Sequence, residues 1–133
     1  MNFNPVGRTK SGEMYMKFHM PFTPVDKIQL LQRSILVNSF AYYELDSNIL
    51  SDFQYDANAM QLAELKKQYP EEFNRSKYHA YFYDYCSEDD GAHYTSGFDL
   101  LERVKKKDKD LYRKLNIDAV MALDMKQKRG VTV

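Results

Sequence analysis

Tyrosine and aspartate side chains gather in one stretch of the sequence, residues 40–56. Tyr42 and Tyr55 could hold a flat ring between their faces, while Asp52 and Asp56, one helical turn apart, could accept hydrogen bonds from a ribose or face a cationic ring. This chemistry suits a nicotinamide nucleotide. A purely structural role fits the same residues, because an aspartate at a helix start caps free amides and a tyrosine three positions later fills the elbow of a helical hairpin.

Two amphipathic helices are predicted to position these side chains. The first begins at Thr23-Pro24-Val25-Asp26, which combines a capping box with a proline at the first helical position. After a loop at residues 47–50, Ser51-Asp52-Phe53-Gln54 repeats the capping signature, and the second helix continues until Tyr69-Pro70. The sequence therefore predicts a helical hairpin over residues 24–70. The stripe of the first helix recurs every three or four positions, at Ile28, Leu31, Ile35, Asn38, Tyr42 and Leu45.

The segments on either side of the hairpin predict a small β element and further helices. Residues 13–20 alternate apolar and polar side chains, and the aromatic run at residues 78–85 is short and rich in strand-forming residues, so both are predicted as strands. Ser96-Gly97 opens one helix and Asp108 can cap a last one, which makes residues 71–133 an aromatic strand followed by basic C-terminal helices. The predicted fold class is mainly α.

The tyrosines of the aromatic run have two interpretations that the sequence does not separate. A tyrosine can pack its apolar ring against other side chains while its hydroxyl stays in contact with solvent. These residues therefore suit a protein-binding surface as well as the edge of a core. The candidate protein-binding residues are Tyr78, Tyr81, Tyr83 and Tyr85.

Length and charge limit the classes of protein. The 133 residues suffice for a single domain, with residues 1–12 as an irregular arm. No apolar run is long enough to span a bilayer, and the single Cys86 has no partner for an internal disulfide, which favours a cytoplasmic protein that does not bind membranes.

The charged residues are divided unevenly along the chain. Residues 1–33 hold five basic and two acidic side chains, residues 34–100 hold four and twelve, and residues 101–133 hold ten and five. An acidic middle between basic ends argues against direct nucleic-acid binding, which needs a continuous basic surface. It fits a basic partner, or a homodimer formed by complementary surfaces.

Three motifs of the hairpin follow one another in a fixed order. They are Tyr42-Tyr43-Glu44-Leu45-Asp46 and Asp52-Phe53-Gln54-Tyr55-Asp56, then Leu62-Ala63-Glu64-Leu65 with Tyr69-Pro70-Glu71. Together they make residues 27–72 resemble the N-terminal Ia subdomain of bacterial NAD-dependent DNA ligases. The resemblance implies that this segment binds the nicotinamide mononucleotide half of NAD. Tyr43 stands where the family has a histidine. The implied ligand-binding residues are Tyr42, Tyr43, Asp52, Tyr55 and Asp56.

No catalytic or metal-binding set is predicted from the sequence. The glycines do not fall at the spacing of a phosphate-binding loop, and the histidines are isolated from the ligands that a zinc site needs. The Lys-x-Asp-Gly adenylation motif of the ligases is also absent, because Asp90-Gly91 follows Glu88-Asp89 and no lysine stands where AMP would be carried. We therefore expect a protein that is not an enzyme and requires no cofactor.

The whole chain looks similar to small stand-alone ligase-related proteins of phages and prophages, in which a segment like Thr95-Ser96-Gly97-Phe98-Asp99-Leu100 follows an aromatic strand. The resemblance implies a phage or prophage protein in the host cytoplasm that binds and inhibits a host protein, with an NAD-consuming defence enzyme as the candidate target. Two alternatives stay open. The chain could be a module that binds nicotinamide mononucleotide or NAD, or an accessory subunit of a split NAD-dependent DNA ligase.

Overall fold

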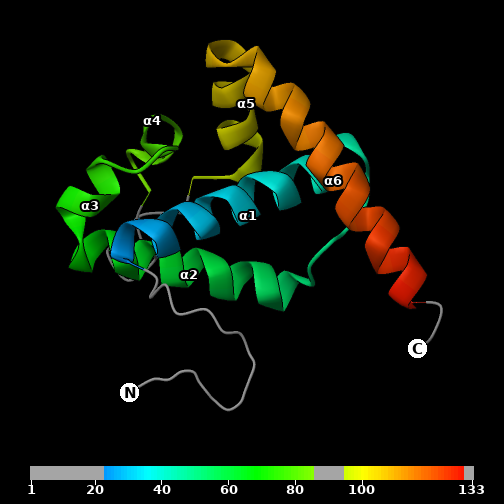
Figure 1. Cartoon of the computed structure of the whole chain (residues 1–133), viewed down its shortest axis with the longest axis horizontal. Helices are drawn as coiled ribbons and strands as arrows, with labels where there is room; N and C mark the ends of the chain where they lie inside the picture. The colour runs from blue at the N-terminus through cyan, green and yellow to red at the C-terminus, as the bar shows by residue number, and fades with distance from the viewer. Residues whose placement is uncertain (1–22, 86–94, 131–133) are drawn as a thin grey trace.

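The computed structural model describes residues 23–85 and 95–130, and within these ranges it contains six helices and no strand. α1 packs against α2, α5 and α6, and it crosses the middle of the molecule in Figure 1. The predicted helical hairpin is confirmed as α1 and α2, and the predicted C-terminal helices as α5 and α6. The helices are α1 (Pro24–Glu44), α2 (Asp52–Gln68), α3 (Pro70–Asn74), α4 (His79–Phe82), α5 (Gly97–Lys107) and α6 (Lys109–Gly130).

Side-chain caps start these helices where the sequence predicts them. Thr23 and Asp26 form a reciprocal capping box at the start of α1, and Ser51 and Gln54 form a second one at the start of α2. The Asp108 carboxylate accepts a hydrogen bond of 3.0 Å from the Leu111 amide in the first turn of α6. Each cap satisfies backbone amides that a helix start leaves without partners.

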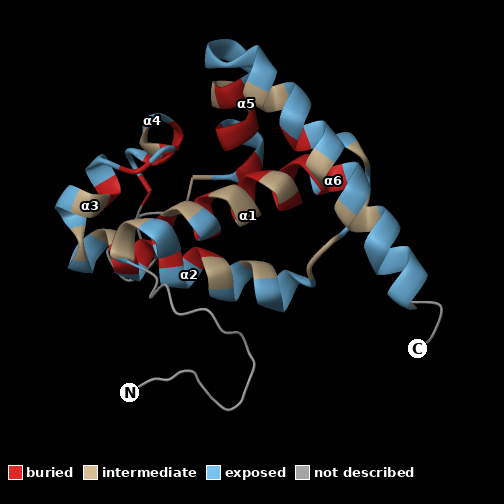
Figure 2. Cartoon of the chain, in the orientation of Figure 1, coloured by how far each residue is buried: buried red, intermediate tan, exposed pale blue. Residues whose placement is uncertain are grey.

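The core lies between α1 and the helices that surround it, where the buried residues are drawn red in Figure 2. Two long-range contacts, one from the middle and one from the C-terminal half of α1, join it to α6. The Phe40 ring meets the Tyr112 ring of α6 edge to face at 5.1 Å, and Arg33 forms an ion pair with Asp118 of α6. The fully buried apolar side chains come from all six described helices and from Tyr85, and include Ile28, Leu36, Leu62, Phe73, Phe82, Leu100, Leu101 and Leu115.

The prediction of a strand at residues 78–85 is wrong. The segment forms turns around the short helix α4, and its buried rings follow the helical spacing i, i+3, i+4 and i+7. Its backbone amides bond locally, from Tyr81 to the Tyr78 carbonyl and from Tyr85 to the Phe82 carbonyl, both at 3.0 Å. The Lys66 ammonium donates to the carbonyls of Tyr83 and Tyr85 at 2.7 and 2.6 Å. The other predicted strand, residues 13–20, and the arm at 1–12 lie outside the described residues.

An ion pair joins the end of the aromatic segment to α5. The Arg103 guanidinium donates two hydrogen bonds of 2.9 Å to the two carboxylate oxygens of Asp84, and the Thr95 hydroxyl donates a third at 2.9 Å. These bonds stabilise the ionised carboxylate, and the hydrogen bond from Arg103 is the main reason that the pKa of Asp84 falls to about 2.

We expect this carboxylate to make part of the stability depend on pH. Because the pKa of Asp84 is lower in the folded chain than in the unfolded one, its contribution is present above about pH 4 and is lost as the pH falls toward 2. The Asp84 side chain is 45% exposed, so solvent screening limits this contribution to about 1 kcal/mol or less. Urea unfolding at pH 5 and pH 2.5 should show a larger loss for the natural chain than for Asp84→Asn; equal losses would contradict the assignment.

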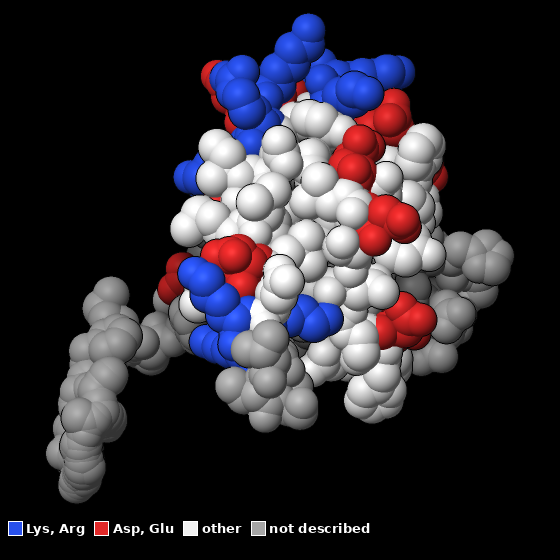
Figure 3. Space-filling view, turned by 90° about the vertical axis from the view of Figure 1, so that its right-hand side faces the viewer, with Lys and Arg blue, Asp and Glu red and all other residues white. Residues whose placement is uncertain are grey.

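Basic side chains gather at one end of the face shown in Figure 3. Figure 3 shows lysine and arginine side chains gathered at the upper end, where α5 meets α6, above a largely white area that acidic and further basic side chains border. The exposed basic residues at this junction are Lys105, Lys106, Lys107, Lys109, Arg113 and Lys114. No helix in residues 23–85 and 95–130 is both long and apolar enough to cross a membrane.

Candidate functional site

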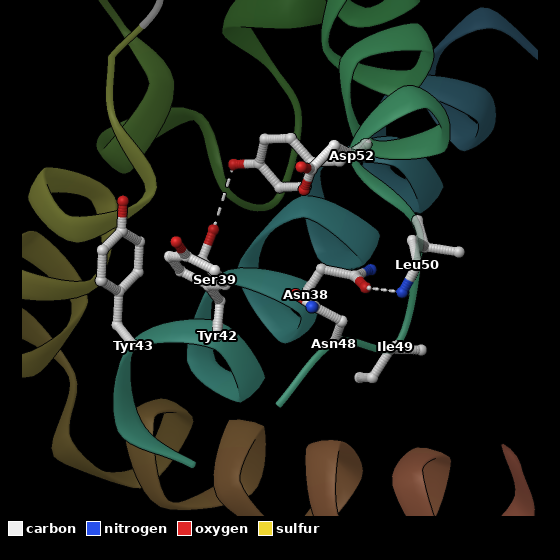
Figure 4. A pocket seen from close by; sticks show the side chains of 9 residues that line it. Asn38, Ser39, Tyr42, Tyr43, Asn48, Ile49, Leu50 and Asp52 are labelled. Atoms are coloured by element: carbon white, nitrogen blue, oxygen red, sulfur yellow. Dashed lines mark hydrogen bonds between the residues drawn. The ribbon is translucent and has the colours of Figure 1, made fainter. Parts of the chain in front are cut away.

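A pocket of about 180 Å³ opens at the corner where α1 ends and α2 begins. Side chains from the last two turns of α1, the connecting loop and the first turn of α2 line it. In Figure 4, Tyr43 and Leu50 mark its two sides, and Asp52 lies across from Ser39. The lining residues are Asn38, Ser39, Tyr42, Tyr43, Asn48, Ile49, Leu50, Asp52 and Tyr55.

Asn38 shapes the floor of the pocket by holding the loop against α1. Its carboxamide oxygen accepts a hydrogen bond of 3.1 Å from the Leu50 amide, and its nitrogen donates to the Ser34 carbonyl at 2.7 Å. Asn38 is only 9% exposed, so water cannot replace these two hydrogen bonds. A buried carboxamide needs such partners, so Asn38 fixes the position of the loop relative to the helix.

Tyr55 is tied to the same helix through its hydroxyl. The Tyr55 hydroxyl and the Ser39 hydroxyl lie 3.2 Å apart and share a hydrogen bond, drawn as a dashed line in Figure 4. Burial raises the pKa of the Tyr55 phenol, and the hydrogen bond with Ser39 opposes this rise only in part. The Tyr55 ring is therefore a neutral, fixed wall of the pocket.

Aromatic rings form the outer rim of the pocket. The Tyr42 and Tyr43 rings meet edge to face at 4.9 Å, and the Tyr43 ring meets Phe98 of α5 in the same way at 5.8 Å. About half of each of these three side chains is exposed. The rim thus offers apolar surface to a ligand or a partner, and it joins α5 to the site.

A backbone turn at Asp46 and a hydrogen bond from α6 also fix the connecting loop. Asp46 takes a left-handed backbone conformation with φ of 51°, which ends α1 and turns the chain. The Lys126 ammonium of α6 donates a hydrogen bond of 2.7 Å to the carbonyl of Asn48. α6 therefore supports a pocket to which it contributes no lining side chain.

The site lies within a segment that has known relatives. Residues 22–76 match the DNA ligase-like, N-terminal NAD+-binding domain. We call this segment the ligase-like domain. The DNA ligases of two strains of Porphyromonas gingivalis, ATCC 33277 and W83, are each 42% identical to this chain over 48 residues. The alignment covers 36% of this chain and only 7% of each ligase. No solved structure matches the chain.

The ligase-like domain brings together most of the side chains that the sequence singles out. Tyr42, Tyr43, Asp52 and Tyr55 all line the pocket, whereas Asp56 is exposed one turn farther along α2 and does not. Their role as ligand-binding residues stays a prediction. Five further residues line the pocket without having been predicted as ligand-binding residues, namely Asn38, Ser39, Asn48, Ile49 and Leu50. One signal was present, because Asn38 is the polar member of an otherwise apolar and aromatic stripe.

The tyrosines of the aromatic run are divided between core and surface. Tyr78, Tyr81 and Tyr85 are buried, and the Tyr78 hydroxyl accepts a hydrogen bond of 3.1 Å from Arg33. Only Tyr83 is exposed, with the Arg103 guanidinium 4.7 Å from its ring centre. Of the two interpretations, burial supports the core for three of these rings, and a protein-binding role remains a prediction for Tyr83.

Proposed function

We propose that the pocket at the α1–α2 corner binds the nicotinamide mononucleotide half of NAD+, and that the chain acts by binding alone. The observation that supports this most is the convergence of Tyr42, Tyr43, Asp52 and Tyr55 on one pocket of the ligase-like domain. The family matched by residues 22–76 is itself described as NAD+-binding. The aligned segment spans 7% of the length of each matched ligase, so the proposal concerns nucleotide binding and not ligation.

The chemistry and the size of the pocket fit this half of the dinucleotide. A volume of about 180 Å³ is less than the roughly 300–1,000 Å³ of pockets that enclose a whole drug-sized ligand. It suits one ring with part of its ribose, while the phosphate stays in solvent. The Tyr42 and Tyr55 rings offer apolar faces to the pyridinium ring, and the Asp52 carboxylate faces its positive charge or accepts from the ribose hydroxyls.

We propose a role without catalysis, and the sequence at Asp90-Gly91 supports it. No lysine precedes Asp90-Gly91 at the spacing of the adenylation motif, so this chain has no residue of that motif to carry AMP. The described residues also contain no cluster of three or more metal-ligating side chains. We propose that the ligand is held or sensed and not converted.

Asp52 and Asp56 provide a matched test of the site, since they are the same residue type on one helix and only Asp52 lines the pocket. We expect Asp52→Asn to weaken the binding of nicotinamide mononucleotide about tenfold, because a charge-assisted contact is lost. Asp56→Asn removes the same charge one turn away and is expected to change the affinity less than about twofold. Isothermal titration calorimetry of both variants and the natural chain measures these values.

Three outcomes of the titration decide the proposal. Binding that Asp52→Asn weakens and Asp56→Asn spares supports it. Equal weakening by both variants would show a general effect of charge and would remove the assigned site. No heat with the natural chain at millimolar nucleotide would overturn the proposed ligand.

A second function is favoured by the exposed aromatic rim of Tyr42, Tyr43 and Phe98. Aromatic residues are enriched in the centres of protein interfaces. We propose, as this second candidate, that the rim contacts a host protein that the chain inhibits, with an NAD-consuming enzyme as the target class. A pull-down with the natural chain and with Tyr43→Ser/Phe98→Ser tests it. A specific partner should be captured by the natural chain and lost with the double variant, and capture by both would reject the rim.

A further inference from the structure

α6 has one buried side and one side that the described part of the molecule leaves uncovered. Leu115 and Ala119 are fully buried toward the core. On the opposite side, Ile117, Val120 and Met121 are between 50% and 60% exposed. The space-filling view in Figure 3 shows a largely white area below the basic upper end of the molecule, bordered by acidic and further basic side chains. An apolar strip in the middle of an exposed helix face is a common feature of helix pairing.

The outer face of α6 carries a regular stripe of six residues. Their spacing is four, three, four, three and four, which is the spacing of the contact seam in a coiled coil. We call this set the α6 stripe. In chain order it consists of Asp110, Lys114, Ile117, Met121, Asp124 and Lys128.

The charges of the α6 stripe are complementary to those of a second copy that runs in the opposite direction. If a second copy lies antiparallel, Asp110 faces Lys128 of the other copy and Lys114 faces its Asp124, while Ile117 packs on its Met121. Every charged layer then joins opposite signs around an apolar centre. In a parallel pair each residue would meet its own copy, so all four charged layers would join like signs. This charge pattern favours a second copy as the partner, and it favours the antiparallel direction.

We propose that two copies of this chain associate through the α6 stripe as an antiparallel helix pair. This proposal does not depend on nucleotide binding. It replaces the broader expectation of a homodimer formed by acidic and basic segments with one face and one geometry.

The charges of the stripe are available for such a contact. Within one chain, Arg113 pairs with Asp110, and the Lys128 ammonium lies 3.2 Å from the Asp124 carboxylate. All four of these side chains are more than half exposed, so their pairs contribute little and can exchange partners at small cost. A contact along one helix buries less than the roughly 1,600 Å² of a standard interface. We therefore expect a weak, reversible dimer that added salt weakens further.

Charge reversal provides a sharp test by sedimentation equilibrium of the full chain. Lys114→Glu and Asp124→Lys each place like charges in two layers of the antiparallel pair, and each is expected to weaken self-association at least tenfold. An equimolar mixture of these two variants restores opposite charges in both layers and should associate about as well as the natural chain. The double variant Lys114→Glu/Asp124→Lys should also recover.

Controls separate this geometry from other causes. Glu64→Lys, a charge reversal on the exposed side of α2, should leave self-association unchanged. Circular dichroism checks that each single variant keeps its helices. A natural chain that is monomeric at every concentration would overturn the proposal. Self-association that survives both single variants, or that the double variant fails to restore, would overturn it as well.

Discussion

Replacing Phe82 by alanine is expected to lower the free energy of unfolding by about 3–5 kcal/mol. The Phe82 side chain is fully buried, and its ring meets the Tyr85 ring edge to face at 5.4 Å. Removing the ring leaves a cavity that the surrounding helices can close only in part, so both apolar burial and packing contacts are lost. Urea unfolding followed by circular dichroism measures the change.

Tyr83 is the matched control for Phe82, because it is the next residue and also aromatic. Its side chain is 57% exposed, and its main described contact is the Arg103 guanidinium above its ring. Tyr83→Ala is expected to cost no more than about 1 kcal/mol. Losses of equal size at the two positions would contradict the described packing of this segment.

The burial of the tyrosines separates the two structures that the aromatic run could form. In a strand, Tyr81, Tyr83 and Tyr85 would share one face and would be buried or exposed together. In the observed fold Tyr81 and Tyr85 are buried and Tyr83 is not. The strand prediction weighed the β propensity of tyrosine and phenylalanine, and propensity in such short runs is readily overridden by tertiary packing.

The side chains of α1 provide that packing, and they act over long sequence separations. The Gln32 carboxamide donates a hydrogen bond of 3.0 Å to the Ser76 hydroxyl, and the Gln29 carboxamide oxygen accepts one of 2.9 Å from the Lys77 amide. Polar residues on a helix do not reveal in advance which distant backbone they will bind. The aromatic segment could therefore be recognised from sequence as special, but its conformation could not be assigned.

The helical hairpin was predictable because its determinants are local. A capping box joins residues three positions apart, and a proline prevents the residue before it from continuing a helix. Thr23, Ser51 and Pro70 therefore fix the ends of α1 and α2 without any knowledge of the rest of the fold.

The candidate site was predictable only where its residues lie in the hairpin motifs. The sequence places Tyr42, Asp52 and Tyr55 around one corner, and the pocket contains all three. The support from Lys126 to Asn48 joins residues 78 positions apart, and no local pattern indicates it. The same holds for the contact of α5 with the pocket, which depends on Gly97.

Gly97 lets α5 approach the pocket more closely than any larger residue would. A β-carbon at this position would lie 2.4 Å from the Ser39 hydroxyl oxygen, 2.9 Å from the Ser39 β-carbon and 3.1 Å from the Tyr43 ring. Ser39 is itself buried and bonded to Tyr55, so it has little room to move. The absence of a side chain at Gly97 is therefore required by the contact between α5 and α1.

We expect Gly97→Ala to lower the free energy of unfolding by about 1–3 kcal/mol, the cost of overpacking a close contact. Without that contact, replacing glycine by alanine would stabilise a helix by up to about 1 kcal/mol. A loss of stability would therefore indicate the close contact, and a gain would indicate its absence. The variant should also weaken binding of nicotinamide mononucleotide, because Ser39 must move and its bond to the Tyr55 wall is disturbed. Urea unfolding and calorimetric titration measure the two effects.

A double-mutant cycle identifies Ser39 as the cause. Ser39→Gly removes both atoms that lie closest to the added β-carbon. If the contact explains the loss, Gly97→Ala should cost much less in the Ser39→Gly background than in the natural chain. An undiminished loss in that background would show that the close approach of α5 to α1 does not determine the stability at this position. A loss of stability with unchanged nucleotide affinity would instead separate the packing of α5 from the ligand-binding role of the pocket.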